Sequence, residues 1–332
     1  MRMRELTYSA AIREGLAQAM DLSDKVIILG QLVDSKAGVF GTTSGLVDVF
    51  GTNRVQDFPV AEGLMTSSAI GAALAGMRPV LVHQRLDFML YSLDAIGNWL
   101  SLWRFKSNGL SDVPVTIRAV VGKGWGQGPQ HSKSLHAWFT HLPGLRVAMP
   151  STAQDAKGLL LESIFGEVPS IIVEDRSLFS MTDNVPEEPY RVKFGEACVR
   201  CTGVDVTVVA IGGMVPASIR AAKTLGFESV SVEVIDPRTL TPLDIDTILN
   251  SVRKTRRLLV VDPGWRSAGV SAELISSVCE RLGTDLACNP KRVCLPDSHT
   301  PMSYSLEKEY YPDENTIVNA VLSMLQVSVG DT

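Results

Sequence analysis

The 332-residue chain is long enough for two domains of ordinary size, and its 45% hydrophobic and 20% charged residues are typical of a packed globular protein. The net charge of -5 is mild for this length and includes no basic excess, which argues against a nucleic-acid-binding protein. No apolar run is long enough for a membrane-spanning helix, and the N-terminal residues lack the apolar core of a signal peptide. We therefore expect a cytoplasmic protein with no membrane partner.

Cysteine usage predicts reduced thiols rather than disulfides. The chain has five cysteines, an odd number that makes a poor disulfide framework. Cys198 and Cys201 form a single C-x-x-C pair, and no second pair or nearby histidine completes a set of metal ligands. A strand that uses both cysteines as small hydrophobic residues is therefore the favoured interpretation.

Helical and strand patterns alternate through the first part of the chain. Thr7 can cap a helix over 7–20, and 26–29 is a short apolar run, typical of a buried strand, that ends at Gly30. The same criteria predict helices at 46–50, 62–77, 90–104 and 153–165, and strands at 55–60, 79–83, 113–121, 145–149 and 170–174. This order predicts an α/β domain with a mostly parallel sheet, which we assign to residues 1–180.

A second α/β region follows a linker. Prolines and charged residues without a clear period indicate the linker, which we place at 181–200. Beyond it the pattern predicts strands at 205–211, 230–235, 258–261 and 292–295, and helices at 216–225, 243–252, 270–282 and 314–325. We assign residues 201–332 to this second domain.

In folds of this class, ligands bind beyond the carboxyl ends of the strands, which here means the segments after Leu29, Val60, His83 and Val121. Glu62 lies in the second of these segments and opens a predicted helix. Its carboxylate has two interpretations. It is either a favourable charge at a helix N-terminus, worth about 0.3–1 kcal/mol, or a catalytic acid or base in a cleft.

A glycine-rich segment follows the strand predicted at 113–121. Its glycines, at 122, 124, 126 and 128, match neither G-x-G-x-x-G nor a Walker loop, but alternating glycines suit a loop that lines a ligand site. His131 follows closely, and it is either a surface residue or a proton-transfer group. The spacing of His136 and His141 is not that of a metal-binding pair on one helix face.

Several short motifs occur in order along the chain. They are Phe58-Pro-Val-Ala-Glu62-Gly, Ile70 to Pro79, Asp87-Phe88, Gln130-His131-Ser, Pro143 to Pro150, Asp155 to Leu159, and Val234 to Leu240 followed by Pro242. Together they resemble the β subunits of 2-oxo acid dehydrogenase E1 components. The resemblance covers nearly the whole chain, from about Glu5 to Leu325.

The resemblance implies a pyrimidine-binding domain followed by a transketolase-type C-terminal domain. It also implies an α2β2 assembly with thiamine diphosphate at the interface of α and β subunits. In this family the α chain carries a G-D-G…N signature that holds Mg2+ and the diphosphate. No G-D-G occurs in this sequence, which fits a chain that supplies only the pyrimidine side.

Single residues also acquire roles from the resemblance. Glu62 matches a glutamate that hydrogen-bonds a ring nitrogen of the aminopyrimidine and so favours the imino tautomer, whose nitrogen removes the C2 proton of the thiazolium. Phe88 matches an aromatic residue that packs on the pyrimidine. His131 matches a histidine that orients intermediates and assists acyl transfer to a lipoyl arm. A potassium ion bound by backbone carbonyls is implied at Val115, Ser163, Ile164, Gly166 and Val168.

Three positions depart from the family pattern. Gln31 is a predicted cofactor-binding residue that stands where an acidic residue usually follows the first strand, so a proton-relay role at this position is in doubt. Arg85 replaces a small or apolar residue, and Lys133 replaces an uncharged glutamine. These cations favour an anionic substrate, such as a 2-oxo acid or a phosphorylated sugar. The alternative is that both pair with local acids.

Three functions are therefore considered. The leading hypothesis is an E1 β subunit that, with its α partner, decarboxylates a 2-oxo acid and passes the acyl group to a lipoyl carrier, with a lipoyl acyltransferase as a further partner. The second is a two-subunit transketolase-like enzyme that transfers a two-carbon or acyl unit to a sugar or aldehyde. The third is a non-catalytic regulatory or scaffold subunit, which the presence of Glu62, Phe88 and His131 together disfavours.

Overall fold

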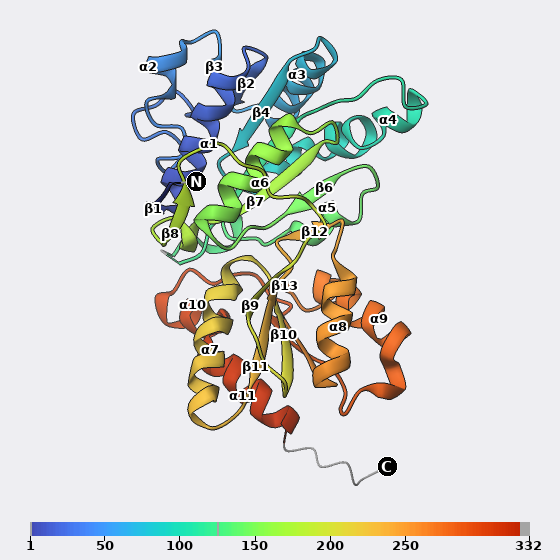
Figure 1. The fold of residues 1–332 in the computed structure, drawn as a ribbon. Coiled ribbons are helices and arrows are strands. Elements are labelled where there is room, and N and C mark those ends of the chain that lie inside the picture. Colours follow the sequence, from blue (N-terminus) through green and yellow to red (C-terminus); the bar gives the residue numbers. More distant parts are fainter. Residues whose placement is uncertain (1, 125, 326–332) are drawn as a thin grey trace. The chain divides into compact units, whose positions relative to one another are not determined.

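The computed structural model describes residues 2–124 and 126–325, and the chain divides into two compact units. Unit 1 extends to Lys123 and includes Gln130–Phe194, whereas unit 2 comprises Gly124–Pro129 and the chain from Gly195 onward. Both units are built from strands and helices (Figure 1). Residues 326–332 of the predicted second domain lie outside the described residues.

Unit 1 contains a parallel sheet flanked by helices. Its strands are β1 (Met3–Thr7), β2 (Val26–Gly30), β3 (Val55–Asp57), β4 (Arg78–His83), β5 (Thr116–Val121), β6 (Arg146–Ala148), β7 (Ser170–Asp175) and β8 (Thr182–Pro186). Its helices and helical turns are α1 (Tyr8–Leu22), α2 (Leu46–Phe50), α3 (Glu62–Leu74), η1 (Phe88–Ser92), η2 (Ala95–Leu100), α4 (Trp103–Lys106), α5 (His136–Thr140), α6 (Ala153–Phe165) and η4 (Arg176–Leu178). The strands pair in parallel in the order β6-β7-β5-β4-β2-β3. A separate antiparallel pair joins β1 to β8.

The core of unit 1 lies between this sheet and the helices α1 and α6. Val80 and Val82 of β4 pack there, so the alternating side chain of His83 points to the opposite face of the sheet. The last residue of β2 is Gly30. A side chain would not fit there, because a Cβ would lie 2.6 Å from the Val82 carbonyl oxygen of β4. The close approach of β2 and β4 at this point therefore requires glycine at the end of β2.

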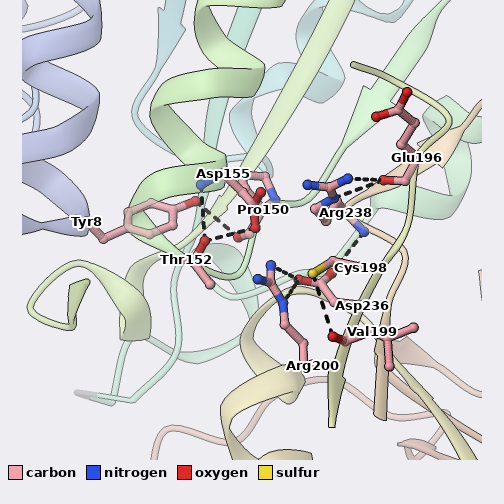
Figure 2. Close-up of polar contacts among 10 residues, drawn as sticks. All are labelled: Tyr8, Pro150, Thr152, Asp155, Glu196, Cys198, Val199, Arg200, Asp236 and Arg238. Carbon is pink, nitrogen blue, oxygen red and sulfur yellow. Dashed lines mark hydrogen bonds and ion pairs between the residues drawn. The ribbon is translucent and has the colours of Figure 1, made fainter. Parts of the chain in front are cut away.

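Two polar contacts anchor the helices that cover this core (Figure 2). The hydroxyl of Tyr8, at the start of α1, donates to the Pro150 carbonyl oxygen at 3.2 Å. Thr152 caps α6, because its Oγ1 accepts a hydrogen bond from the backbone N–H of Asp155 at 3.1 Å. Both helices are therefore held close to the segment that follows β6.

Unit 2 has a second sheet, in the order β14-β13-β10-β11-β9. The strands of unit 2 are β9 (Cys198–Cys201), β10 (Val206–Ala210), β11 (Val232–Asp236), β12 (Thr239–Thr241), β13 (Leu258–Trp265) and β14 (Lys291–Leu295), of which β12 is not part of this sheet. Its helices and turns are η5 (Gly212–Met214), α7 (Val215–Phe227), α8 (Ile245–Thr255), α9 (Val270–Leu282), η6 (Gly283–Asp285), α10 (Tyr304–Tyr310) and α11 (Glu314–Leu325). The turn η3 (Gly128–Gln130) lies where the chain passes from unit 2 back to unit 1. Only β9 is antiparallel to its neighbour among the described strands of this sheet.

The edge strand β9 is fixed by charge pairing at the end of β11 (Figure 2). Asp236 is fully buried and accepts hydrogen bonds from Nε and Nη2 of Arg200, at 3.2 and 2.7 Å. Its other oxygen accepts from the backbone N–H of Arg238. Cys198 and Cys201 belong to β9 and are free thiols, so the strand interpretation of the C-x-x-C pair is confirmed.

Most predicted elements occur close to the predicted residues, with three differences. The segment 90–104 is not one helix but the 3₁₀ turn η1, the π-helical turn η2 and the short α4. The linker expected at 181–200 begins with the strand β8, which was not predicted. β1, β12, α5 and α10 were not predicted.

Candidate functional site

A cavity of about 630 Å3 lies in unit 1 where β2 and β4 end and α3 begins. It is lined by Gln31, Val60, Ala61, Glu62, Gly63, Leu64, Gln84, Phe88 and Tyr91. Three of the predicted site residues, Gln31, Glu62 and Phe88, therefore meet in one place. This place lies beyond the carboxyl ends of two parallel strands, as the fold class predicts.

The Glu62 carboxylate is buried and held by an amide. Glu62 is the first residue of α3 and is 7% exposed. The side-chain amide of Gln31 donates to Glu62 Oε1 at 3.3 Å. The carbonyl oxygen of Gln31 in turn accepts a hydrogen bond from the Gln84 side chain at 3.4 Å. The neutral Gln31 thus orients the carboxylate and adds no second charge beside it.

Phe88 and His131 contact each other beside this cavity. Their rings lie edge to face, with centroids 5.5 Å apart and planes at 79°. The approach of His131 depends on Gly122, because a Cβ at that position would lie 2.3 Å from the His131 carbonyl oxygen. The structure therefore brings His131 next to an aromatic residue that lines the cavity.

The two unexpected cations have different surroundings. Lys133 pairs with Asp87, since its Nζ and its backbone nitrogen each lie 3.3 Å from Asp87 Oδ1. Arg85 is 6% exposed, and its guanidinium carbon lies 4.8 Å from the centre of the Phe40 ring. Burial lowers the pKa of Arg85, the charge of Asp87 raises it, and the charge of Arg176 lowers it further. Lys133 therefore pairs with a local acid, which is the alternative considered above.

Four of the five backbone carbonyls implied as potassium ligands accept hydrogen bonds from the chain. Nη1 of Arg78 donates to the carbonyl oxygens of Ile164 and Gly166, at 2.9 and 2.8 Å. The carbonyl oxygen of Val115 accepts from the backbone N–H of Ser170, and that of Val168 from the Ser170 hydroxyl. Ser163 is buried in α6, where its hydroxyl donates to the Leu159 carbonyl oxygen. A guanidinium group therefore already binds two of the implied carbonyl oxygens at this turn.

Sequence reasoning missed several residues of this region. Gln84 and Tyr91 line the cavity, and their proximity to Phe88 in the chain was the available signal. His83 is 1% exposed, burial lowers its pKa to about 3, and neither ring nitrogen has a hydrogen-bond partner among the described residues. Nothing in the sequence indicated that His83 differs in its surroundings from the apolar residues of the same strand. The described residues also contain no group of His, Cys, Asp and Glu side chains that could hold a metal ion.

These groups suit a flat, nitrogen-containing ring. A buried carboxylate can accept a hydrogen bond from a ring nitrogen, and an aromatic side chain can pack against the ring face. The cavity is large enough for such a ring, and none of the described residues that line it has a cationic side chain that would hold a diphosphate. These residues therefore fit the pyrimidine half of thiamine diphosphate.

Comparison with known proteins agrees with this division of the chain. Residues 4–181 match the pyrimidine-binding domain of transketolase, and residues 195–317 match the transketolase C-terminal domain. A solved split-gene transketolase, described as an inactive β4 tetramer, has the same fold, with a TM-score of 0.75 and 22% identity over 97% of this chain and 99% of that one.

Relatives with clear sequence similarity span almost the entire chain. The β subunit of acetoin:2,6-dichlorophenolindophenol oxidoreductase from Cupriavidus necator is 38% identical over 96% of both proteins, and that from Bacillus subtilis is 36% identical over 97% of this chain and 98% of the relative. The pyruvate dehydrogenase E1 β subunit of Staphylococcus aureus is 37% identical over 98% of this chain and all of the relative. The chain therefore belongs to the transketolase-like, thiamine diphosphate-dependent family, among the β subunits of E1-type dehydrogenases.

Proposed function

We propose that this chain is the β half of a thiamine diphosphate enzyme that cleaves a bond next to the carbonyl of a 2-oxo acid and passes the acyl unit to a lipoyl carrier. The observation that carries the proposal is the cavity shared by Glu62, Gln31 and Phe88, with the Glu62 carboxylate held by Gln31. The partner is an α-type subunit in an α2β2 assembly in the cytoplasm, and it supplies the magnesium and diphosphate site. A lipoyl acyltransferase is the proposed acceptor protein.

Each residue has one task in this proposal. Glu62 accepts a hydrogen bond from the protonated ring nitrogen of the cofactor, and Gln31 keeps that carboxylate in position. Phe88 covers the ring face, and His131 donates a proton or a hydrogen bond to the reacting oxygen. When bound, thiamine diphosphate supplies a carbanion and an electron sink for decarboxylation. Potassium has no part in the proposal, because Arg78 already binds two of the implied carbonyls.

The test of the site is Glu62→Gln in the assembled α/β enzyme. A glutamine of the same size cannot stabilise a proton on the ring nitrogen, so we expect turnover to fall by about 10²-fold or more while the assembly persists. Size-exclusion chromatography checks the assembly, and exposed Glu228→Gln is the matched control. Turnover equal to that of the wild type would overturn the role of Glu62.

The acceptor and the substrate need a separate assay. The names of the relatives include both acetoin and pyruvate, so both compounds are tested with the assembled enzyme. The dye 2,6-dichlorophenolindophenol, a lipoyl domain and a small aldehyde are offered in turn as acceptors. Reduction of the dye or acylation of the lipoyl domain supports the proposal. Carbon–carbon bond formation with the aldehyde alone would favour the transketolase-like alternative.

A further inference from the structure

The ring contact between Phe88 and His131 joins two segments that are distant in the chain. Phe88 begins the turn η1 after β4, whereas His131 follows the glycine-rich segment after β5. An edge-to-face contact of two rings is worth only about 0.5–1.5 kcal/mol beyond the burial of their surfaces. This contact by itself is therefore a weak restraint on a histidine that lies outside the regular elements.

The segment that leads to Phe88 is fixed to the sheet. The backbone N–H of Leu86 donates to the carbonyl oxygen of Val120, in β5, at 2.9 Å. The Leu86 side chain is fully buried, and the next residue, Asp87, is 6% exposed. The carboxylate of Asp87 is therefore attached to a firmly held backbone beside the end of β5.

This carboxylate binds the segment that carries His131. Asp87 precedes η1, a position from which an aspartate often accepts a hydrogen bond from its own helix, but here it makes no such bond. Its Oδ1 instead accepts hydrogen bonds from the backbone N–H and from Nζ of Lys133, both at 3.3 Å. Asp87 is the neighbour of Phe88, and Lys133 lies two residues after His131. One carboxylate oxygen thus ties together the two segments whose rings touch.

The backbone of His131 is confined on its other side by Gly122. A Cβ at Gly122, directly after β5, would lie 2.3 Å from the His131 carbonyl oxygen. Ser132, between His131 and Lys133, is 1% exposed. Gly122 limits how far the segment can approach the sheet, and Asp87 attracts it through a charge-assisted contact. Loss of the attraction would leave His131 with the steric limit and the ring contact alone.

We infer that Asp87 is a positioning residue of the reaction. Acting through Lys133, its carboxylate holds the His131 imidazole beside Phe88, at the cavity that contains Glu62. Asp87 is not among the described residues that line this cavity, so it acts on His131 and not on the substrate. The inference rests on the proposed function, since it takes His131 as the group that donates to the reacting oxygen.

The first test measures turnover of the assembled α/β enzyme. Asp87→Ala removes both contacts with Lys133, and we expect kcat to fall by about tenfold or more, with KM for the 2-oxo acid changed by less than about twofold. Asp87→Asn keeps an acceptor for the Lys133 backbone N–H and should recover most of this loss. Asp112→Ala is the control, because it breaks an ion pair with Arg104, and neither residue lines the cavity.

Combining Asp87→Ala with His131→Ala separates positioning from a general effect on the fold. If Asp87 acts through His131, its substitution costs nothing more once the imidazole is absent. We expect kcat of the double variant to lie within about twofold of that of His131→Ala. Additive losses would overturn the inference and leave the proposed role of His131 intact. Wild-type turnover in His131→Ala would instead disprove that role, and the inference with it.

The second test needs neither cofactor nor partner. The full-length chain has five histidines, and NMR of ring-labelled histidine follows each of them, with His131→Ala identifying the signal of His131. Phe88→Leu shows how far the Phe88 ring shifts this signal. Asp87→Ala should move it towards its position in Phe88→Leu, whereas Asp87→Asn and Asp112→Ala should leave it near that of the wild type.

An unchanged His131 signal in folded Asp87→Ala would show that the carboxylate does not hold the ring. Circular dichroism checks that each variant is folded. Asp87→Leu, which puts an apolar side chain of similar shape at this buried position, provides the same measurement if Asp87→Ala does not fold.

Discussion

At the scale of single residues, the surroundings of Glu62 separate a catalytic role from a purely structural one. A carboxylate in the first turn of a helix needs no further partner to be favourable. Here it is 7% exposed, lines a cavity and is hydrogen-bonded by Gln31, which itself is held by Gln84. A neutral amide at this position leaves Glu62 as the one carboxylate among the residues that line the cavity.

Gln31→Glu places a second carboxylate beside Glu62, where the amide nitrogen now lies 3.3 Å from Oε1. Two neighbouring carboxylates cannot both ionise easily, so the pKa of one is raised. We expect the acidic limb of the pH profile of kcat/KM to move to higher pH in the assembled enzyme by about one unit or more. Gln31→Met, which adds no charge, should leave the limb in place. Coincident profiles for the two variants would contradict the prediction.

His83 should make the protein sensitive to acid. Burial lowers the pKa of His83 to about 3, so the unfolded chain binds a proton below about pH 6.5 that the folded chain does not. The free energy of unfolding therefore falls as the pH drops from about 6.5 towards 3. His83→Leu removes this loss. The difference in the free energy of unfolding between His83→Leu and the wild type should therefore shift in favour of the variant by about 2 kcal/mol between about pH 7.5 and about pH 5.

Urea unfolding at the two pH values measures this difference. His141→Leu is the control, because His141 is exposed. The same pH dependence in wild type and His83→Leu would show that His83 becomes protonated in the folded state at mild acidity.

At the scale of elements, the turn between α6 and β7 is held by a side chain of β4. Arg78, the first residue of β4, donates to two carbonyl oxygens at the C-terminal end of α6, those of Ile164 and Gly166. A cation is favourable there because the helix dipole places negative partial charge at that end. The guanidinium thus supplies the charge that a bound monovalent cation would supply.

Arg78→Gln should therefore lower the free energy of unfolding by about 1–3 kcal/mol. The melting temperature of the wild type should be the same in KCl and NaCl. That of the variant should be lower and should recover in part in KCl, because the released carbonyls can then bind potassium. Scanning calorimetry in the two salts measures both effects. A wild-type melting temperature that rises specifically in KCl would show that potassium binds alongside Arg78.

Helices and strands were predicted accurately where the apolar pattern of the segment itself indicates that it is buried. They were predicted less accurately where pairing with a distant segment determines the secondary structure. The strand β2 and the helix α6 have the predicted residues almost unchanged. β1 has an exposed start and becomes a strand only by pairing with β8, far along the chain. The segment 90–104 has a wide apolar face, but its backbone passes through 3₁₀ and π-helical turns, which the apolar pattern does not reveal.

At the scale of the whole molecule, the chain has a place for a pyrimidine but no sequence motif for a diphosphate. No G-D-G occurs in it, and none of the residues that line the cavity is cationic. None of the described helices has the length and apolarity needed to span a bilayer. The site is therefore proposed to be complete only when a partner chain is bound.

The isolated chain should bind thiamine diphosphate weakly, and Mg2+ should not improve the affinity. Adding the α-type partner should produce tight, magnesium-dependent binding, because the diphosphate then has ligands. Calorimetric titration with and without the partner measures the difference. Tight magnesium-dependent binding by this chain alone would contradict a shared site.

The sequence by itself determined the α/β class, predicted two domains and singled out Glu62 and His131 as candidates, whereas Phe88 became a candidate through the resemblance of short motifs to the E1 β family. These follow from local patterns, since buried strands, helix caps and short motifs depend on neighbours in the chain. Only the tertiary structure decided which charges meet. It paired Lys133 with Asp87, placed Arg78 on the carbonyls of α6 and set Arg85 and Arg176 against one ring. Such contacts join strand ends that are distant in sequence, and the packing of the sheet alone brings them together.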